Sequence, residues 1–459
     1  MGRLVVVSNR LADPRKAAAG GLAVALGESL QRTGGLWFGW SGHIAEPGEA
    51  LTDEPEVTRW GKVSLAGLAL SREDHDGYYL GYANKVLWPV FHYRLDLADF
   101  ESGFLDRYKA VNQRFARALK PLLKDDDVLW IHDYHLIPLG AELRALGCKQ
   151  RIGFFLHIPL PPPQLLSAMP GADWLLRMLF AYDLVGFQAQ ADVQHFARFG
   201  QAEGDVVPLP GDRYSGFGRV LKAQAFPIGM DVDEFRRLGE QREAVETFEQ
   251  MRDQYSHRRV LIGADRLDYS KGLPQRFRAF KRLLDEYEDT RSSATLIQIA
   301  APSREEVDAY ADIRRELEGL TGAINGQYGT LDWVPIRYIH RALARKRMPG
   351  LCRAAKVALV TPLRDGMNLV AKEFVAAQDP EDPGVLVLSR FAGAAEQMKQ
   401  AILVNPHDTQ GTAAAIHRAL QMPLEERRQR HAALLAGITE FDIHWWRRSY
   451  LAALEEAAP

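Results

Sequence analysis

One short segment in the second half of the chain combines two cationic side chains with the end of an expected strand. Residues 266–272 read RLDYSKG, directly after an apolar run at 260–264 and before a helical pattern. Arg266 and Lys271 are therefore expected at the carboxyl edge of a sheet, beside a helix N-terminus that adds its own positive potential. Because cations at a helix start oppose the helix dipole unless an anion is bound, the loop favours an anion site over two solvated surface cations.

A second segment repeats the same order of strand, tight turn and helix. Residues 361–373 read TPLRDGMNLVAKE. Asp365 on the turn and Glu373 in the helix could accept hydrogen bonds from sugar hydroxyls. Without the neighbouring motifs, a plain turn residue and a surface charge explain these two positions equally well.

Histidines close two strands in the first half of the chain. Residues 132–135 read HDYH and residues 155–159 read FLHIP. A zinc site is not expected, because no cysteine pair, no HExxH motif and no third ligand at a suitable spacing accompanies them. His132 and His135 could be hydrogen-bonded core residues. His157, which precedes a proline-rich loop, is the stronger candidate for a position in a cleft.

Glycines and aromatic residues of the N-terminal part allow two further interpretations. Gly20 and Gly21 lie between the first strand and a helical pattern, where backbone amides could approach a phosphate, although a plain turn explains the pair more simply. Aromatic rings can stack on sugar faces and arginines can bind phosphate in a bidentate manner. The residues of these types are Arg10, Trp37, Trp40, Tyr78, Tyr79, Trp88 and, far along the chain, Arg304.

The apolar pattern predicts the elements that hold these residues. Short apolar runs alternate with helical patterns such as 274–287, which is typical of doubly wound parallel sheets. The runs are at 4–9, 36–40, 128–132, 152–157, 184–187, 260–264, 295–299, 357–361, 385–388 and 402–404. Ten strands would make one unusually large parallel sheet, so two Rossmann-like halves with a boundary near 226–231 are the simpler partition.

Composition restricts the classes of protein that remain. The 459 residues carry 57 Lys and Arg against 59 Asp and Glu, a net charge of −2, so nucleic acid and membrane partners are not expected. The two cysteines, Cys148 and Cys352, indicate a reducing compartment. The N-terminus lacks the features of a signal peptide and no apolar stretch is long enough to span a membrane, so we expect a cytoplasmic protein.

Taken in order, these motifs resemble those of the trehalose-6-phosphate synthases. They are VSNR (7–10), AGGL (19–22), WFGWSG (37–42), LWP (87–89), WIHDYHL (130–136), FLHIP (155–159), RLDYSKG (266–272) and RDGMNLVAKE (364–373). The resemblance implies an α/β GT-B fold, with two Rossmann-like domains whose parallel sheets face a central cleft. It also implies domains at 1–229 for the acceptor and 230–440 for the donor, and a C-terminal helix at 441–459 that packs back on the first domain.

The resemblance also implies a reaction and its residues. The reaction is the retaining transfer of glucose from UDP-glucose to glucose 6-phosphate, with no metal or other cofactor. The acceptor residues would be Arg10, Trp40, Tyr79, Trp88, Asp133 and Arg304. The donor residues would be Gly20, Gly21, His157, Arg266, Lys271, Leu343, Asp365, Leu369, Val370, Ala371, Lys372 and Glu373. The catalytic residues among them would be Arg266, Lys271, His157 and Asp365.

The mechanism expected from these residues is electrostatic. Arg266, Lys271 and helix amides would stabilise the departing diphosphate in place of a divalent cation. The resemblance to the family further implies that the acceptor attacks from the same face and that the leaving phosphate oxygen accepts its proton. Two alternatives stay open: an enzyme that uses another nucleotide-glucose or makes a glucosyl-polyol phosphate, and a silent sugar-phosphate sensor. The sequence leaves the nucleobase preference and a dimeric or tetrameric assembly open.

Overall fold

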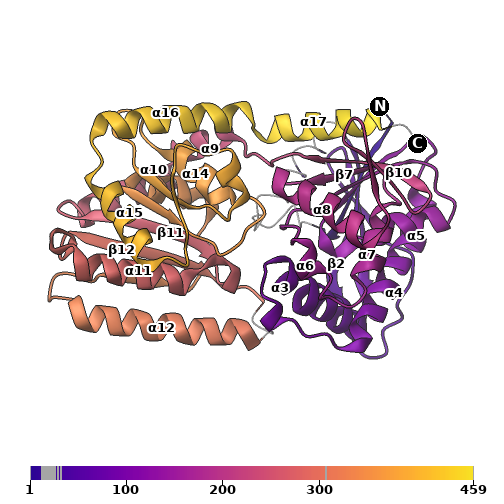
Figure 1. The fold of residues 1–459 in the computed structure, drawn as a ribbon, viewed down its shortest axis with the longest axis horizontal. Coiled ribbons are helices and arrows are strands. Elements are labelled where there is room, and N and C mark those ends of the chain that lie inside the picture. Colours follow the sequence, from indigo (N-terminus) through magenta and orange to yellow (C-terminus); the bar gives the residue numbers. More distant parts are fainter. Residues whose placement is uncertain (1, 12–26, 28–29, 31–33, 305–307, 458–459) are drawn as a thin grey trace. The chain divides into compact units, whose positions relative to one another are not determined.

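The computed structural model describes residues 2–11, 27, 30, 34–304 and 308–457. The chain divides into two compact units. Met1–Pro227 and Trp446–Pro459 belong to the first, and Ile228–Trp445 form the second. Each unit has its own β-sheet with helices packed against it (Figure 1). None of the helices in the described ranges is long and apolar enough to cross a membrane.

The sheet of the first unit contains ten strands within the described residues, in the order β3-β4-β2-β1-β5-β6-β7-β10-β9-β8. They are β1 (Leu4–Arg10), β2 (Gly35–Ile44), β3 (Glu56–Trp60), β4 (Val63–Leu70), β5 (Val128–His132), β6 (Arg151–Phe155), β7 (Leu184–Phe187), β8 (Val207–Leu209), β9 (Arg213–Gly216) and β10 (Arg219–Ala225). The strands from β4 to β10 in this order pair in parallel. Antiparallel pairing is confined to the two edges, β3 with β4 and β8 to β10.

Helices surround this sheet (Figure 1). They are α2 (Arg72–Asp74), the π-helix η1 (His75–Leu87), α3 (Trp88–Phe91), α4 (Ser102–Leu119), α5 (Leu139–Ala145), α6 (Pro163–Leu166), α7 (Ala172–Leu179), α8 (Gln190–Glu203) and α17 (Ile443–Glu456), with short 3₁₀ turns η2 (Leu95–Leu97), η3 (Lys120–Leu122) and η4 (Tyr134–Leu136). Helix η1 packs closely on α4, because a Cβ atom on Gly81 would lie 2.5 Å from the ring of Phe104. Only glycine permits this approach.

The C-terminal helix α17 packs on the first unit through aromatic residues. Tyr450 stacks on Trp130 of β5 with ring centroids 4.6 Å apart, and its hydroxyl donates to the carbonyl of Phe154 at 3.0 Å. A Cβ atom on Gly153 would lie 2.4 Å from that hydroxyl oxygen. The glycine of β6 therefore makes room for the helix.

The second unit contains a six-stranded sheet within the described residues, parallel throughout, in the order β13-β12-β11-β14-β15-β16. The strands are β11 (Arg259–Arg266), β12 (Ala294–Ala301), β13 (Ile336–Ile339), β14 (Val357–Val360), β15 (Val385–Ser389) and β16 (Ile402–Val404). The central strand β14 is buried along its whole length, as expected for a sheet covered on both faces.

Two groups of helices cover this second sheet. In the first group, α12 (Asp308–Tyr328) and α15 (Thr409–Gln421) each contact α11 (Leu273–Glu286). In the second group, α9 (Val232–Gly239), α10 (Arg242–Gln254) and α13 (Met348–Ala354) contact one another, α14 (Leu369–Ala377) contacts α9 and α13, and α16 (Leu424–Glu440) contacts α14. Figure 1 places α11 and α12 on one side of β11 and β12, and α10 and α14 on the other. Short 3₁₀ turns are η5 (Tyr269–Lys271), η6 (Glu288–Thr290), η7 (Arg345–Arg347) and η8 (Gly393–Glu396).

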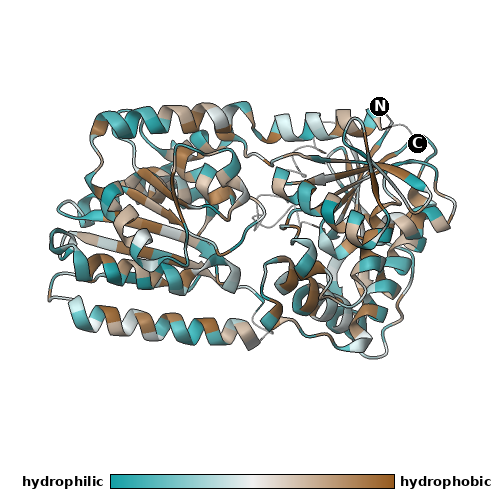
Figure 2. Ribbon diagram, in the orientation of Figure 1, coloured by the Kyte–Doolittle hydropathy of each residue, from teal (hydrophilic) through white to brown (hydrophobic). Residues whose placement is uncertain are grey.

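Hydropathy follows this layering. In Figure 2 brown gathers on inner strands of both units, whereas α12 and α16 alternate between teal and brown along their length. Apolar strands form the core, and amphipathic helices shield it from water. The polar residues considered below lie where strands end.

Candidate active site

In the second unit, the segment 266–272 is a tight turn between β11 and α11. Asp268 accepts a hydrogen bond from the backbone N–H of Ser270 at 2.9 Å, and Gly272 ends the turn with a φ of +65°. A Cβ atom on Gly272 would lie 2.5 Å from the carbonyl oxygen of Thr361. The turn therefore packs backbone to backbone against the residue that follows β14.

The two predicted cations of this turn have different surroundings. Arg266 is exposed at the end of β11. Lys271 is largely buried, and its ammonium lies 2.6 Å from Oδ2 of Asp365. The amide of Asn368 donates to the same carboxylate oxygen at 3.0 Å. The structure thus brings Lys271 and Asp365 together at the carboxyl ends of adjacent parallel strands, where open α/β sheets bind ligands.

The turn 364–368 is held by a side-chain cap and by a close backbone approach. Asn368 has a φ of +79° and caps α14, because its side chain accepts from the N–H of Ala371 at 3.4 Å. Gly393 lies so close to Gly366 that a Cβ atom on it would be 1.8 Å from the Gly366 carbonyl oxygen. The loops after β14 and β15 therefore interlock, which fixes where α14 begins.

The first turn of α14 carries the predicted residues Leu369, Val370, Ala371 and Lys372, followed by Glu373. The ammonium of Lys372 is buried and donates to the carbonyl of Ile228 and to Oε1 of Gln397, both at 2.8 Å. Burial lowers the pKa of Lys372 to about 7. The N–H groups of such a first turn are suited to an anion.

Glu373 and Leu343 lie near an ion pair at the same end of the sheet. Burial raises the pKa of Glu373 to about 7, with Arg345 acting in the opposite direction and Glu234 adding to the rise. Arg345 pairs with Glu234 at 2.6 Å. Leu343 is half-buried in the loop that leads from β13 to Arg345. A partly protonated Glu373 can either donate or accept a hydrogen bond.

Arg304 belongs to this second unit and lies close to the 266–272 turn. Its Nη1 donates to Oδ2 of Asp268 at 3.0 Å and to the hydroxyl of Tyr310 at 2.9 Å. The remaining predicted acceptor residues all belong to the first unit, and they are Arg10, Trp40, Tyr79, Trp88 and Asp133.

In the first unit, an aromatic cluster lies at the end of β1, beside β2 and η1. The guanidinium of Arg10 lies over the ring of Trp40 at 5.2 Å, and the rings of Trp40 and Tyr79 are 5.7 Å apart. A Cβ atom on Gly42, which has a φ of +88°, would meet the Arg10 guanidinium at 2.8 Å. The ring centroids of Trp88 and Tyr134 are 5.7 Å apart, and Tyr134 follows Asp133 in the chain. The cluster places a guanidinium, a group suited to phosphate, beside rings that suit a sugar face.

His157 lies in a network of buried polar side chains. Its Nε2 is 3.0 Å from Nδ1 of His132, and Gln188 donates from Nε2 to its Nδ1 at 3.3 Å. The backbone N–H of His157 donates to Asp133 at 3.2 Å, and Asp133 itself has a φ of +75°. Burial lowers the pKa of His157 to about 3, so the imidazole is neutral near pH 7. A neutral ring orients a ligand and is a poor general acid.

Several residues that contact the candidate site residues were missed by the sequence analysis. Asp268 and Asn368 stand inside the quoted motifs, but nothing in the sequence showed that they hold Arg304 and Asp365. Gln188 and Tyr310 lie outside every motif. Gly20 and Gly21 lie outside the described residues. Within the described ranges, no group of three or more His, Cys, Asp or Glu side chains could hold a metal ion.

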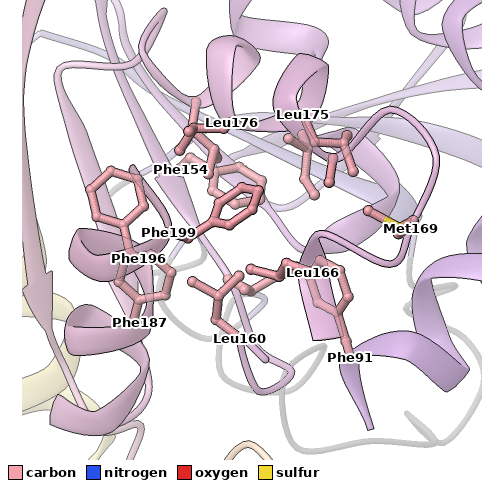
Figure 3. Close-up of a pocket in the computed structure, with 14 residues that line it drawn as sticks. Phe91, Phe154, Leu160, Leu166, Met169, Leu175, Leu176, Phe187, Phe196 and Phe199 are labelled. Atoms are coloured by element: carbon pink, nitrogen blue, oxygen red, sulfur yellow. The ribbon is translucent and has the colours of Figure 1, made fainter. Parts of the chain in front are cut away.

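One internal cavity of the first unit is unrelated to these polar groups. It measures about 30 Å³ and is enclosed by apolar side chains from β6, β7, α3, α6, α7 and α8 and from neighbouring loops (Figure 3). Phe154, Leu176 and Phe196 point into it. A cavity of this size and lining stays dry and offers no hydrogen bond to a sugar or phosphate.

Comparison with known proteins shows sequence similarity along almost the whole chain. The model of glycosyltransferase family 20 matches residues 7–456. The trehalose-6-phosphate synthase of Enterobacter sp. strain 638 is 46% identical over 461 residues, covering 100% of this chain and 96% of the relative.

Two solved structures extend this similarity to the fold. One is an α,α-trehalose-phosphate synthase (UDP-forming) from Burkholderia xenovorans in complex with glucose-6-phosphate, with 47% identity, a TM-score of 0.94, and coverage of 99% of this chain and 100% of that one. The other is the Escherichia coli protein bound with UDP-2-fluoro glucose, with 44% identity, a TM-score of 0.95 and full coverage of both chains. The α/β GT-B fold class predicted from the sequence is confirmed.

Proposed function

The chain belongs to glycosyltransferase family 20, and we propose that it transfers glucose from UDP-glucose to glucose 6-phosphate, which yields α,α-trehalose 6-phosphate and UDP. The observation that carries this proposal is the similarity along the whole chain to enzymes of this activity, one solved with a donor analogue and one with the acceptor. The contact between Lys271 and Asp365 at the ends of β11 and β14 supports it chemically.

The donor is assigned to the second unit and to His157. Arg266, Lys271 and the first turn of α14, Leu369 to Lys372, bind the diphosphate with fixed positive charge and N–H groups. Glu373 binds the ribose and the backbone of Leu343 contacts the base. Gly20 and Gly21 complete the donor residues. His157 and Asp365 orient the glucose, and the neutral imidazole suits that role.

The acceptor is assigned to Arg10, Trp40, Tyr79, Trp88, Asp133 and Arg304. The two arginines bind the 6-phosphate, since a guanidinium matches a phosphate in a bidentate manner. The ring of Trp40 lies beneath the guanidinium of Arg10 and limits the positions that this side chain can adopt. The aromatic rings and Asp133 bind the sugar itself, as expected for a site that uses both apolar sugar faces and hydroxyl groups.

The reaction follows from where charge develops. Cleavage of the anomeric bond places negative charge on the departing diphosphate, and preorganised cations stabilise that charge more than they stabilise the intact donor. Arg266 and Lys271 take the place of the divalent cation used by other transferases. The acceptor attacks from the face that the diphosphate leaves, and the leaving phosphate oxygen takes its proton, so the anomeric configuration is retained.

A matrix of donors and acceptors tests this function. The purified protein is incubated with UDP-, ADP- or GDP-glucose and with glucose 6-phosphate, glucose or a polyol phosphate, and each product is identified by NMR. We expect UDP release and α,α-trehalose 6-phosphate from UDP-glucose and glucose 6-phosphate. A glucosyl-polyol phosphate as main product, a β linkage, or no nucleotide release in any combination would contradict the proposal, the last in favour of a sensor.

Two further properties belong to this proposal. Cys148 and Cys352 are both buried and neither forms a disulfide, which suits the cytoplasm. The substrates are small and anionic, and the net charge of −2 offers no general attraction to nucleic acid or anionic lipid. The proposed binding of the diphosphate and the 6-phosphate therefore depends on local groups of cations and not on the net charge of the protein.

A further inference from the structure

Asp268 is a fully buried carboxylate that serves two separate segments of the second unit. Its Oδ1 accepts from the backbone N–H of Ser270 at 2.9 Å, inside the 266–272 turn that carries Lys271. Its Oδ2 accepts from Nη1 of Arg304 at 3.0 Å and from the hydroxyl of Tyr310 at 3.2 Å. One side chain thus connects the turn after β11 with the segment after β12.

Burying the Asp268–Arg304 ion pair and holding Arg304 at a positive φ both cost free energy. This cost indicates that the contact has a role besides stabilising the fold. A buried ion pair often contributes little net stability, because both charges lose their hydration. The side chain of Arg304 is only 8% exposed, and its backbone has a φ of +48°, an unfavourable region for a residue with a Cβ atom. Such conformations persist where the surrounding contacts require them, and they concentrate at functional sites.

We propose that Asp268 is a positioning residue that holds Arg304 ready for the acceptor phosphate and, through its other oxygen, fixes the turn that carries Lys271. This inference rests on the proposed function, because it takes Arg304 as a phosphate ligand and Lys271 as a diphosphate ligand. Asp268 itself touches neither substrate. It acts on the acceptor through Arg304 and on the donor through the 268–271 turn.

The physical basis is preorganisation. A long arginine side chain loses conformational freedom when it binds a phosphate, and a chain already held in place loses less. Asp268 and Tyr310 both bind Nη1, so one end of the planar guanidinium fork is fixed and its orientation is set before the acceptor arrives. Tyr310 also donates to Asp268, which closes a three-membered network.

The two carboxylate oxygens allow the two effects to be separated. Asp268→Asn keeps an oxygen for the N–H of Ser270 but removes the negative charge opposite Arg304. We expect KM for glucose 6-phosphate to rise about 10- to 100-fold, with KM for UDP-glucose within about twofold. Asp268→Ala removes both contacts, so KM for both substrates should rise. Tyr310→Phe should raise only the acceptor KM, by a smaller factor.

Asp265→Asn provides a matched control. Asp265 pairs with Arg276 at 2.5 Å and is comparably buried, but it is bonded to neither Arg304 nor Ser270. If the Asp268 effect were a general consequence of breaking a buried ion pair, Asp265→Asn would reproduce the selective rise in acceptor KM. We expect it to lower thermal stability and to leave the ratio of the two KM values unchanged.

A double-mutant cycle gives the decisive result. Because Asp268 acts on the acceptor through Arg304, Asp268→Asn should add little to the acceptor KM of Arg304→Ala, although each single change raises it. Additive losses, or equal changes in both KM values for Asp268→Asn, would overturn the positioning role. A wild-type protein that releases no UDP with glucose 6-phosphate would instead overturn the proposed function, so the two failures are distinguishable.

Discussion

The ammonium of Lys271 lies 2.6 Å from Oδ2 of Asp365, although 94 positions separate the two residues in the chain. They meet because each follows a strand, β11 and β14, and these strands are parallel neighbours in the sheet. Both side chains are only 12% and 14% exposed. Asp365 therefore sets the position of the cation as well as being a candidate sugar ligand itself.

Lys271→Met should lower kcat strongly. The change removes a fixed charge that acts mainly on the departing diphosphate, and the loss of one such group typically costs about 10² to 10³ in turnover. Steady-state assays of UDP release measure it. Lys281→Met is the control, because Lys281 pairs with Asp285 on the exposed face of α11. Equal activity of both variants would contradict a role for Lys271 in catalysis.

Arg266→Ala should also reduce kcat by about 10² to 10³, for the same electrostatic reason. Arg259 at the opposite end of β11 gives a control on the same strand, since it bonds to Ser293 and Asp289 far from the carboxyl edge. Arg259→Ala should keep kcat within a few-fold of the wild type. A turnover number for Arg266→Ala in that same range would show that the leaving-group assignment is wrong.

The sequence analysis found the strands better than the contacts between them. Each of the ten expected apolar runs overlaps a strand, and the helix expected at 274–287 is α11 at 273–286. Six of the described strands were missed, namely β3, β4, β8, β9, β10 and β13. β3 and β8 are largely exposed, and β9, β10 and β13 are only partly buried, so none of these five shows a continuous apolar run. β4 is mostly buried, but Ser64 and Gly67 interrupt its apolar residues. The π-helix η1 was also missed. Its position depends on the contact of Gly81 with the ring of Phe104 in α4, and a contact between two helices cannot be read from the apolar pattern of one segment.

In the candidate site, too, single residues could be predicted but their contact partners could not. Motifs pointed to Lys271 and Asp365, because each follows a recognisable strand, and to Glu373, because it lies in a recognisable helix. Their partners were not predictable, because Lys372 meets Ile228 across 144 positions and Arg304 meets Asp268 across 36. Such pairs are set by the register of strands and the path of loops, which apolar periodicity does not encode.

Gly393→Ala should destabilise the second unit. The added Cβ atom would lie 1.8 Å from the carbonyl oxygen of Gly366, so one of the two interlocked loops must move, at a cost of about 1 to 3 kcal/mol or more. Thermal unfolding measures the loss. Gly322→Ala in α12 is the control, because nothing lies within 4 Å of its added atom and alanine favours a helix. Equal melting temperatures of the two variants would contradict the interlocked geometry.

Lys372 should make stability depend on pH above neutrality. Its pKa is about 7 in the folded protein and near its ordinary value of about 10.4 when unfolded. Between these values the unfolded chain binds more protons, so the free energy of unfolding rises with pH, by up to about 1.4 kcal/mol per unit. Below pH 7 both states are protonated and this slope disappears.

A comparison with Lys372→Met isolates that contribution. Urea denaturation from pH 7 to 9.5 should show that the free energy of unfolding of the wild type rises relative to that of the variant as the pH rises. Other titrating groups cancel in this difference. Lys356→Met should follow the wild type, since Lys356 is exposed and pairs with Asp382. A pH-independent difference between the wild type and Lys372→Met would mean that the buried ammonium keeps its ordinary pKa.

His157→Asn should lower kcat without changing the shape of its pH profile. Burial holds the pKa of His157 at about 3, so the neutral ring neither gains nor loses a proton between pH 5.5 and 8. Its role is orientation, for which a loss of about 10- to 100-fold is reasonable. His195→Asn, a change in α8 of the same unit, should leave kcat near that of the wild type. If His157→Asn removed one limb of the wild-type profile, the imidazole would have to act as an acid or base, and the same-face mechanism would need a protein proton carrier.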